Sequence, residues 1–459
     1  MSNQRLTVSN RHGSPGSSIF DLPSQPVHSN LSSSNDLSLG STYHVIEQPA
    51  TTPQTGDPSF IIISGGTGGN AICTAFKNAC YVLPVSDDGG SSSEIIRVLG
   101  GPSIGDIRSR LVRLIPQAPL SSPLDSIRSF LAYRLPRQCT QREAREEWRD
   151  IVEGRSALWK GIPSDRKETI RGFLVYFESE LLKRAHKNFD FRNGSIGNYF
   201  LAAAQGFFRS LPSAIFLFSS ITSSQAHILP VIVTNHTVTI AAELTDGERL
   251  VGQCEISHPV VSTELSFRVT SDDAPESPTE ALGEVIASKQ NIMFESMAKG
   301  THEPLPSRIN RLYYINGYGM EIHPSPNPDF LSNLGSRDIL VYSCGSLWTS
   351  IMPCLALRGV ASAIARSSSV RVKVLLLNTE NDRETDGYSA EDYILAIART
   401  LNTNYSTPAY GLGGANTIYP ISAFITDVVY LKGTSVAVDV EKITALELAM
   451  RQVWADRVS

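Results

Sequence analysis

A run of apolar residues passes directly into a glycine-rich segment at residues 60–72, which read FIIISGGTGGNAI. A continuous apolar run predicts a strand covered on both faces, as in a parallel sheet. Glycine at four of the five positions 65–69 leaves the backbone open to a close neighbour, and we expect a helix to begin near Ala71. Backbone N–H groups at the start of a helix bind anions, so the segment predicts a phosphate site. A tight strand-to-helix turn is the alternative, because the segment matches neither the P-loop nor strict G-x-G-x-x-G.

Strand and helix patterns alternate along the rest of the chain. Helical patterns lie between several strands; in one of them Ile104, Ile107 and Leu111 share one face. This alternation is typical of an α/β protein with a largely parallel sheet. Apolar runs predict further strands at 81–85, 311–316, 338–343, 370–378 and 425–431.

Two segments depart from this alternation. Residues 237–256 alternate apolar and polar side chains around a central Asp-Gly dipeptide, which predicts an antiparallel β-hairpin at or beside the sheet. Residues 117–190 form a charged insertion with two helical patterns, and one of these opens with Thr140 and Glu143 at capping-box spacing. We interpret its charges as solvated helix faces, with a partner-docking surface as the alternative.

The N-terminal segment differs in composition from everything that follows. Residues 1–57 are rich in serine, asparagine, proline and glycine and poor in large apolar residues, which predicts a disordered tail. A mitochondrial transit peptide is the alternative, but Arg5 and Arg11 are few and no amphipathic run follows. We therefore expect one folded domain at 58–459 that contains the 117–190 insertion.

Charge, hydropathy and cysteine spacing argue against several classes of function. A net charge of −5 and a pI near 6.0 disfavour nucleic-acid binding, which usually needs a clearly basic face. The uncharged segment 339–357 is interrupted by Gly345 and Pro353, so it predicts a strand, a turn and a helix rather than a membrane span. Six cysteines without zinc-site or redox-motif spacing predict free thiols, mostly buried, in a reducing compartment, and we expect a cytoplasmic protein.

Carboxylates follow the predicted strand at 81–85. Asp87 and Asp88 stand at its end, ahead of Gly-Gly-Ser-Ser-Ser, and Asp106 lies at the start of a later helix. Adjacent carboxylates at a sheet end suit Mg²⁺, which keeps several waters and bridges to phosphates. A helix cap is the alternative for Asp87 and for Asp106.

Two more loops of small residues precede helices. SCGSLWTS at 343–350 follows the strand at 338–343, and GSIGNYFLAAAQ at 194–205 carries Gly197 and Asn198 at a helix start. In an open α/β sheet, ligands bind beyond the carboxyl ends of the strands. We therefore expect these loops to converge with the glycine-rich segment on one polyanionic ligand.

Six segments, taken in order, resemble a known superfamily. They are IISGGTGGNAI, VSDDGGSSSEI, GPSIGDIRSRL, GSIGNYFLAAA, CGSLWTSIMPCLAL and ETDGYSAEDY, and they resemble 2-phospho-L-lactate transferase (CofD-like) proteins. The closer match is to the gluconeogenesis factor branch, also called UPF0052. The resemblance covers roughly residues 60–395 outside the insertion. It implies a Rossmann-like, largely parallel sheet with an antiparallel β-hairpin and a helical insertion, in a protein that binds a nucleotide.

The resemblance also implies roles for individual residues. Asp88 and Asp106 match the metal-binding aspartates of the transferase, so they are the candidate Mg²⁺ ligands. The candidate contacts to a nucleotide or UDP-sugar are Gly65, Gly66, Thr67, Gly68, Gly69, Asn70, Ser91, Ser92, Asn198, Gly345 and Ser346.

Two hypotheses of function remain open at this point. The first is a nucleotide- or UDP-sugar-binding regulator of carbon metabolism, as the gluconeogenesis factor branch implies. The second is a Mg²⁺-dependent phosphotransferase of the 2-phospho-L-lactate transferase type with an unknown acceptor. The motifs explain phosphate and metal binding but supply no evident general base, which favours the regulator. The sequence leaves the oligomeric state open, a homo-oligomer included.

Overall fold

The computed structural model describes residues 57–258, 303–403 and 417–453. Contacts divide the chain into two units, Met1–Gln54 and Thr55–Ser459, and every described residue belongs to the second. The predicted disordered tail therefore lies outside the described residues except for Asp57.

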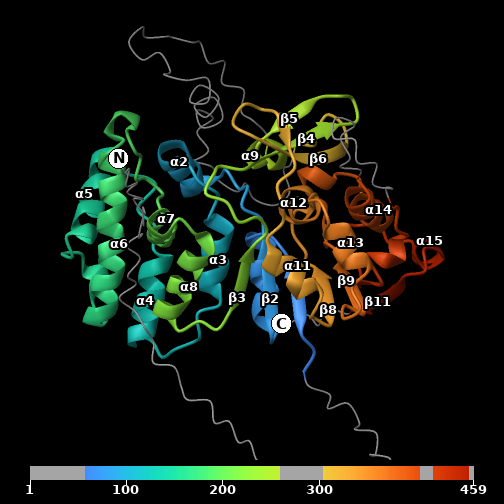
Figure 1. The fold of residues 1–459 in the computed structure, drawn as a ribbon, viewed down its shortest axis with the longest axis horizontal. Helices are drawn as coiled ribbons and strands as arrows, with labels where there is room; N and C mark the ends of the chain where they lie inside the picture. The colour runs from blue at the N-terminus through green and yellow to red at the C-terminus, as the bar shows by residue number, and fades with distance from the viewer. Residues whose placement is uncertain (1–56, 259–302, 404–416, 454–459) are drawn as a thin grey trace, which may run out of the picture. The chain divides into compact units, whose positions relative to one another are not determined.

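A parallel sheet of seven strands forms the centre of the second unit (Figure 1). Its order is β11-β10-β9-β8-β1-β2-β3, and all neighbouring pairs are parallel. The predicted α/β fold with a largely parallel sheet is confirmed. The strands are β1 (Phe60–Ile63), β2 (Ala79–Leu83), β3 (His227–Pro230), β8 (Ile339–Tyr342), β9 (Val372–Leu376), β10 (Asp427–Leu431) and β11 (Ala449–Val453).

Helices follow most of these strands. Ile61, Ile62 and Ile63 of β1 are all buried, as expected for a strand covered on both faces. The helices are α1 (Thr67–Ile72), α2 (Gly90–Leu99), α3 (Gly105–Arg113), α4 (Pro123–Ala132), α5 (Gln141–Val152), α6 (Ser164–Leu182), α7 (Ile196–Phe208), α8 (Leu211–Thr222), α9 (Gln253–Ser257), α11 (Pro328–Leu334), α12 (Met352–Leu355), α13 (Val360–Ala365), α14 (Ala390–Leu401) and α15 (Val440–Ala445).

The strand order reverses between β1 and β8. The chain runs through β1, β2 and β3 toward one edge of the sheet, and later through β8, β9, β10 and β11 toward the other. Ligands of open α/β sheets bind outside the carboxyl ends of the two strands at such a reversal. The loops that follow Ile63 and Tyr342 lie at this position.

A separate antiparallel sheet has the order β5-β4-β6-β7. Its β4 (Thr239–Leu244) and β5 (Arg249–Val251) form the predicted hairpin, but residues 253–257 belong to α9 instead of extending the second strand. The remaining strands are β6 (Ile309–Ile315) and β7 (Glu321–Ile322). The predicted strand at 311–316 is confirmed as β6, which pairs with β4 rather than with a strand of the parallel sheet. Residues 312–315 are all buried, so their apolar run looks the same as that of a parallel strand.

The charged segment 117–190 folds into α4, α5 and α6, which lie together in Figure 1. Thr140 and Glu143 form the predicted capping box at the start of α5. Trp148 of α5 is buried, and its ring centroid lies 5.2 Å from that of Phe191 and 5.2 Å from that of Tyr199. Because Tyr199 lies on α7, this aromatic cluster fixes the helical segment to the helix that begins with the predicted Asn198 loop.

Residues 339–357 fold as predicted. They form β8, a π-helix at Leu347–Ile351 and α12. In the part of the chain that the structure describes, no helix is both long and apolar enough to cross a membrane. All six cysteines lie within the described residues, and none of them forms a disulfide.

Candidate functional site

The glycine-rich segment turns into α1 immediately after β1. The helix begins at Thr67, with Gly66 as its N-cap, rather than near Ala71 as we predicted. The Asn70 N–H donates a hydrogen bond of 3.1 Å to the Gly66 carbonyl, which closes the first turn. Gly68 therefore lies inside a helix, where glycine costs about 0.5–1 kcal/mol relative to alanine. This cost needs a compensating reason.

Contacts within the protein supply that reason. A β-carbon at Gly68 would lie 2.7 Å from the Cα of Gly345 in the loop after β8, so only glycine allows the two backbones to approach. The glycine pattern alone is thus explained by packing and does not require a ligand. An added β-carbon would collide with Ser350 if placed at Gly65, with Asp106 at Gly66, with Gly345 at Gly68, and with Arg110 and Ser64 at Gly69.

Asp87 and Asp88 both accept hydrogen bonds from α9, where Gln253 Nε2 donates to Asp87 Oδ1 at 3.2 Å. Asp88 accepts a hydrogen bond of 2.8 Å from the Cys254 N–H at the start of α9. Asp87 accepts one of 3.0 Å from the Gly89 N–H, a turn typical of aspartate. Asp106 lies in the first turn of α3 but is not its N-cap, which is Ile104. The cap interpretation of Asp106 is therefore wrong.

Asp87 and Asp106 are electrostatic neighbours. Burial, and then the negative charges of Asp106 and Asp88, raise the pKa of Asp87 well above its ordinary value. Burial also raises the pKa of Asp106 to about 6, against the opposing effect of Arg110 and Arg108. Two carboxylates that disfavour each other's ionisation gain from a cation placed between them. Asp106 thus has an acidic neighbour in Asp87, and the pair Asp88 and Asp106 as Mg²⁺ ligands stays a prediction.

Arg110 of α3 lies behind the glycine-rich segment. Its side chain is fully buried and donates to Asn70 Oδ1 at 2.8 Å, Ser64 Oγ at 3.1 Å and the Gly65 carbonyl at 3.0 Å. Among the described residues its Nη1 finds no acceptor. The predicted Asn70 therefore holds α3 against the loop, and Arg110 brings a positive charge there that we did not predict.

Arg108, a second buried arginine, connects the first turns of α3, α7 and α2. Arg108 Nε donates to Asn198 Oδ1 at 2.9 Å, and Asn198 Nδ2 donates to Ser91 Oγ at 2.8 Å. A β-carbon at Gly197 would collide with the Leu131 carbonyl oxygen and lie 3.0 Å from Arg108 Cδ, so this glycine lets α4 and the arginine approach α7. The predicted Ser91 and Asn198 are thus brought together, and the neighbouring Ser92 is buried in the same turn of α2.

The loop after β8 is held by polar contacts from the next segments. Asn378 accepts a hydrogen bond of 2.9 Å from the Gly345 N–H and donates one of 2.8 Å to the Gly345 carbonyl. Glu384 accepts bonds of 2.9 Å and 3.0 Å from the N–H groups of Trp348 and Thr349. The N–H groups that follow the predicted Gly345 and Ser346 are therefore already bound to a carboxylate.

Glu384→Gln is expected to change how stability depends on pH. Burial, and then the charge of Asp382, raise the pKa of Glu384 from 4.5 to about 8. The stability that Glu384 contributes is fully present below about pH 4.5 and is lost as the pH rises through about 8. The melting temperature of the unsubstituted protein, relative to that of the variant, should fall across this interval. Parallel melting profiles would contradict the prediction, and exposed Glu380→Gln is the control.

The structure gathers most of the predicted residues. It pairs Gly66 with Asp106, Gly68 with Gly345, and Ser91 with Asn198. Residues that sequence reasoning missed include Arg108 and Glu384, although the motifs GPSIGDIRSRL and ETDGYSAEDY contain them. Asp88 accepts a hydrogen bond from the backbone of α9, and Asp87 accepts one from the side chain of Gln253 in the same helix.

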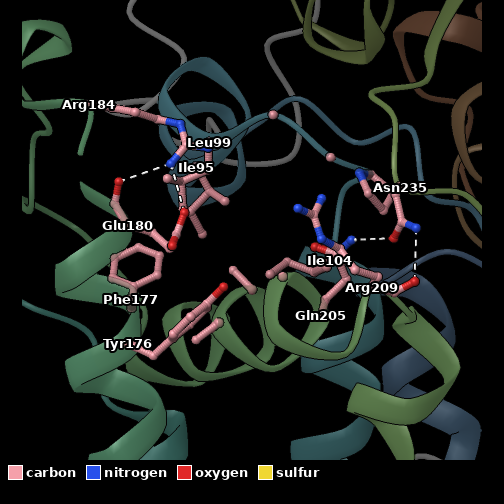
Figure 2. A pocket seen from close by; sticks show the side chains of 16 residues that line it. Ile95, Leu99, Ile104, Tyr176, Phe177, Glu180, Arg184, Gln205, Arg209 and Asn235 are labelled. Atoms are coloured by element: carbon pink, nitrogen blue, oxygen red, sulfur yellow. Dashed lines mark hydrogen bonds and ion pairs between the residues drawn. The ribbon is translucent and has the colours of Figure 1, made fainter. Parts of the chain in front are cut away.

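A pocket lies at the opposite ends of α2 and α7 from Ser91 and Asn198 (Figure 2). Its polar side chains satisfy one another: Arg184 pairs with Glu180 at 2.9 Å, and Gln205 donates to Asn235 at 2.9 Å. It contains none of the predicted site residues. The lining is Ile95, Leu99, Gly100, Gly101, Pro102, Ile104, Tyr176, Phe177, Glu180, Arg184, Ala202, Ala203, Gln205, Gly206, Arg209 and Asn235.

The fold and these contacts define a Rossmann-like α/β protein with charged loops at the carboxyl edge of its parallel sheet. The family model for 2-phospho-L-lactate transferase CofD matches residues 60–453, so the chain belongs to this family. An uncharacterized Saccharomyces cerevisiae protein, YNL011C, is 36% identical over 83% of this chain and 91% of its own length. The gluconeogenesis factor of Halalkalibacterium halodurans is 21% identical over 73% of this chain and 72% of its own length.

A solved structure has the same fold. A UPF0052 family protein from Bacillus halodurans matches with a TM-score of 0.53 and 19% identity, over 86% of this chain and 92% of that one. The resemblance to the superfamily and to its gluconeogenesis factor branch is confirmed.

Proposed function

We propose that this protein binds a nucleotide-type phosphorylated small molecule, with a UDP-sugar as the first candidate, at the carboxyl edge of the parallel sheet. We further propose that it acts as a regulator of carbon metabolism in the cytoplasm. Support for the regulatory role is the name of its bacterial relatives, gluconeogenesis factor. Six cysteines outside any disulfide are consistent with a reducing compartment.

Charged side chains that form no ion pair carry this proposal. Asp87, Asp106, Arg108 and Arg110 lie at one edge of the sheet, and no ion pair within 4.0 Å joins any of them to another described residue. Buried or half-buried charges are normally paired, because desolvation is costly. A ligand with phosphates, accompanied by a cation, would neutralise both signs at once.

The carboxylates of Asp87 and Asp106 suit Mg²⁺ better than they suit a metal ion whose ligands all come from the protein. Across the described residues, no three side chains of His, Cys, Asp or Glu converge as a metal site. Mg²⁺ usually takes one or two carboxylates, with waters and substrate phosphates completing its coordination. We propose Asp106 and Asp87 as the protein ligands, with the predicted Asp88 as the competing partner of Asp106. The ion would bridge the protein to the phosphates.

A ligand screen tests the proposal directly. The melting of the full chain is followed with UMP, UDP, UDP-N-acetylglucosamine, GMP and GDP, each with Mg²⁺ and with EDTA. A ligand present at 100 times its Kd is expected to stabilise the protein by about 2.7 kcal/mol. We expect the gain with diphosphates to require Mg²⁺. If none of these compounds raises the melting temperature, the proposed function fails.

A phosphotransferase is the second candidate function. The description of the matching family names a 2-phospho-L-lactate transferase, and a Mg²⁺-binding pair of aspartates would serve such a reaction. Its test is turnover: UDP or GDP incubated with protein and Mg²⁺ should yield nucleoside monophosphate and inorganic phosphate in equal amounts over time, with water taking the place of the unknown acceptor. A stable, stoichiometric complex favours the regulator.

A further inference from the structure

Arg134 brings a cation from the helical segment to the candidate site. It follows α4, and its backbone forms an antiparallel bridge with Ser195, three residues before Asn198. Its Nη1 donates one hydrogen bond of 3.0 Å to the Asn193 carbonyl. Burial of the guanidinium among neighbouring groups lowers the pKa of Arg134, but the residue keeps an exposed surface through which a ligand can reach it.

The Arg134 backbone lies beside the start of α7, to which Arg108 is also bound. Arg134 pairs with Ser195, Ser195 Oγ accepts from the Asn198 N–H at 3.4 Å, and Asn198 Oδ1 accepts from Arg108 Nε at 2.9 Å. Burial, and then the positive charge of Arg134, lower the pKa of Arg108. Arg108 is only 8% exposed, and its one hydrogen bond to a described residue uses Nε, which leaves the terminal nitrogens for another acceptor. Two neighbouring guanidinium groups repel each other, and neither forms an ion pair with a described residue. An anion between them would relieve this repulsion.

The charged groups form a row along the sheet edge. Gly66 of the glycine-rich segment contacts Asp106, and a β-carbon at the adjacent Gly105 would lie 2.9 Å from Asp87 Oδ2. Arg108, two residues after Asp106, donates to Asn198 at the start of α7, where the Arg134 backbone pairs with Ser195. The row therefore begins at the reversal between β1 and β8 and ends with cations at the start of α7. A ligand whose phosphates extend along it would meet the carboxylates and their ion before it meets the arginines.

We propose that Arg134, together with Arg108, binds the terminal phosphate of the ligand, on the side of Asp87 away from the glycine-rich segment. This inference rests on the proposed function and names which part of the ligand the helical segment recognises. A guanidinium offers five N–H donors in a planar fork that matches phosphate oxygens. The hydrogen bond to the Asn193 carbonyl uses one of the five N–H donors, so Arg134 can keep this contact and still bind the phosphate.

A comparison of mono- and diphosphates tests the inference. UMP, UDP, GMP and GDP are titrated calorimetrically, with Mg²⁺, into the full chain and into Arg134→Ala and Arg134→Lys. Loss of a charge-assisted bond to a terminal phosphate should weaken UDP and GDP binding about tenfold and leave UMP and GMP nearly unchanged. Lysine keeps the charge but not the fork, so Arg134→Lys should recover part of the loss.

Controls separate this result from a general loss of structure. Arg142→Ala removes an arginine of the same helical segment whose side chain is 87% exposed, and it should change no affinity. If Arg134→Ala lowers all four affinities equally, or none, the inference is overturned while the proposed function stands. If the unsubstituted protein binds none of the four, the inference is overturned, and the proposed function fails with it when UDP-N-acetylglucosamine also gives no stabilisation.

Discussion

Replacing Gly68 with alanine is expected to destabilise the protein by about 2–3 kcal/mol, the upper part of the range for overpacking. The added β-carbon would lie 2.7 Å from the Cα of Gly345 and 2.8 Å from the carbonyl oxygen of Cys344. Both atoms belong to the backbone, which cannot rotate away as a flexible side chain can. The loops after β1 and β8 would have to separate. Urea unfolding of the two proteins measures the difference.

Gly172→Ala is the matched control, because it adds the same methyl group to another helix. Gly172 lies within α6, and no described atom lies within 4 Å of the position that its β-carbon would take. Alanine there should stabilise the protein by about 0.5–1 kcal/mol. If both substitutions shift the urea midpoint in the same direction, the packing explanation of the glycine-rich segment is wrong.

The glycine contacts also decide how binding experiments on this segment are read. A bulky residue at Gly68 would disturb Gly345 first, so a loss of affinity would not identify a phosphate contact. Substitutions at the charged side chains do not have this problem. Asparagine in place of aspartate keeps the shape of the side chain and removes its charge.

The fold could be predicted from sequence because its signals are local. Apolar runs such as that of β1, each followed by small residues and a helical pattern, are enough to indicate a parallel α/β sheet. The sequence of a strand does not show which other strand it pairs with. Residues 311–316 are as apolar as a strand of the main sheet, and only tertiary structure pairs them with β4. The hairpin was found because its Asp-Gly turn is a signal within the segment itself.

The site was predicted as a set of loops, but not in its detailed chemistry. Six motifs identified the loops at the sheet edge, and the structure brings Ser91 to Asn198 as expected. Adjacent positions in a sequence do not reveal where side chains point, so Asp87 and Asp88 could not be told apart. Arg134 lies in a segment that we interpreted as solvated helices. Only its bridge to Ser195 brings it to the site.

Asp106→Asn is expected to weaken diphosphate binding about 100-fold in Mg²⁺, equivalent to about 2.7 kcal/mol, and to have little effect in EDTA. The charge of Asp106 would hold the ion that bridges to the phosphates, and an amide oxygen is a weaker ligand for a hard cation. The Gly66 N–H faces this carboxylate, and an asparagine oxygen can still accept from it. Affinities are measured by calorimetry in both conditions.

A double-mutant cycle then identifies the second ligand. Asp87→Asn and Asp106→Asn would remove the same ion, so the double variant should lose little more affinity than either single one. Asp88 accepts a hydrogen bond from the Cys254 N–H, which asparagine can also accept, so Asp88→Asn should add independently to Asp106→Asn. Coupling of Asp106 to Asp88 instead of Asp87 would restore the pair expected from the family resemblance. Losses that persist in EDTA would exclude a shared metal and leave a site where the arginines bind the phosphates alone.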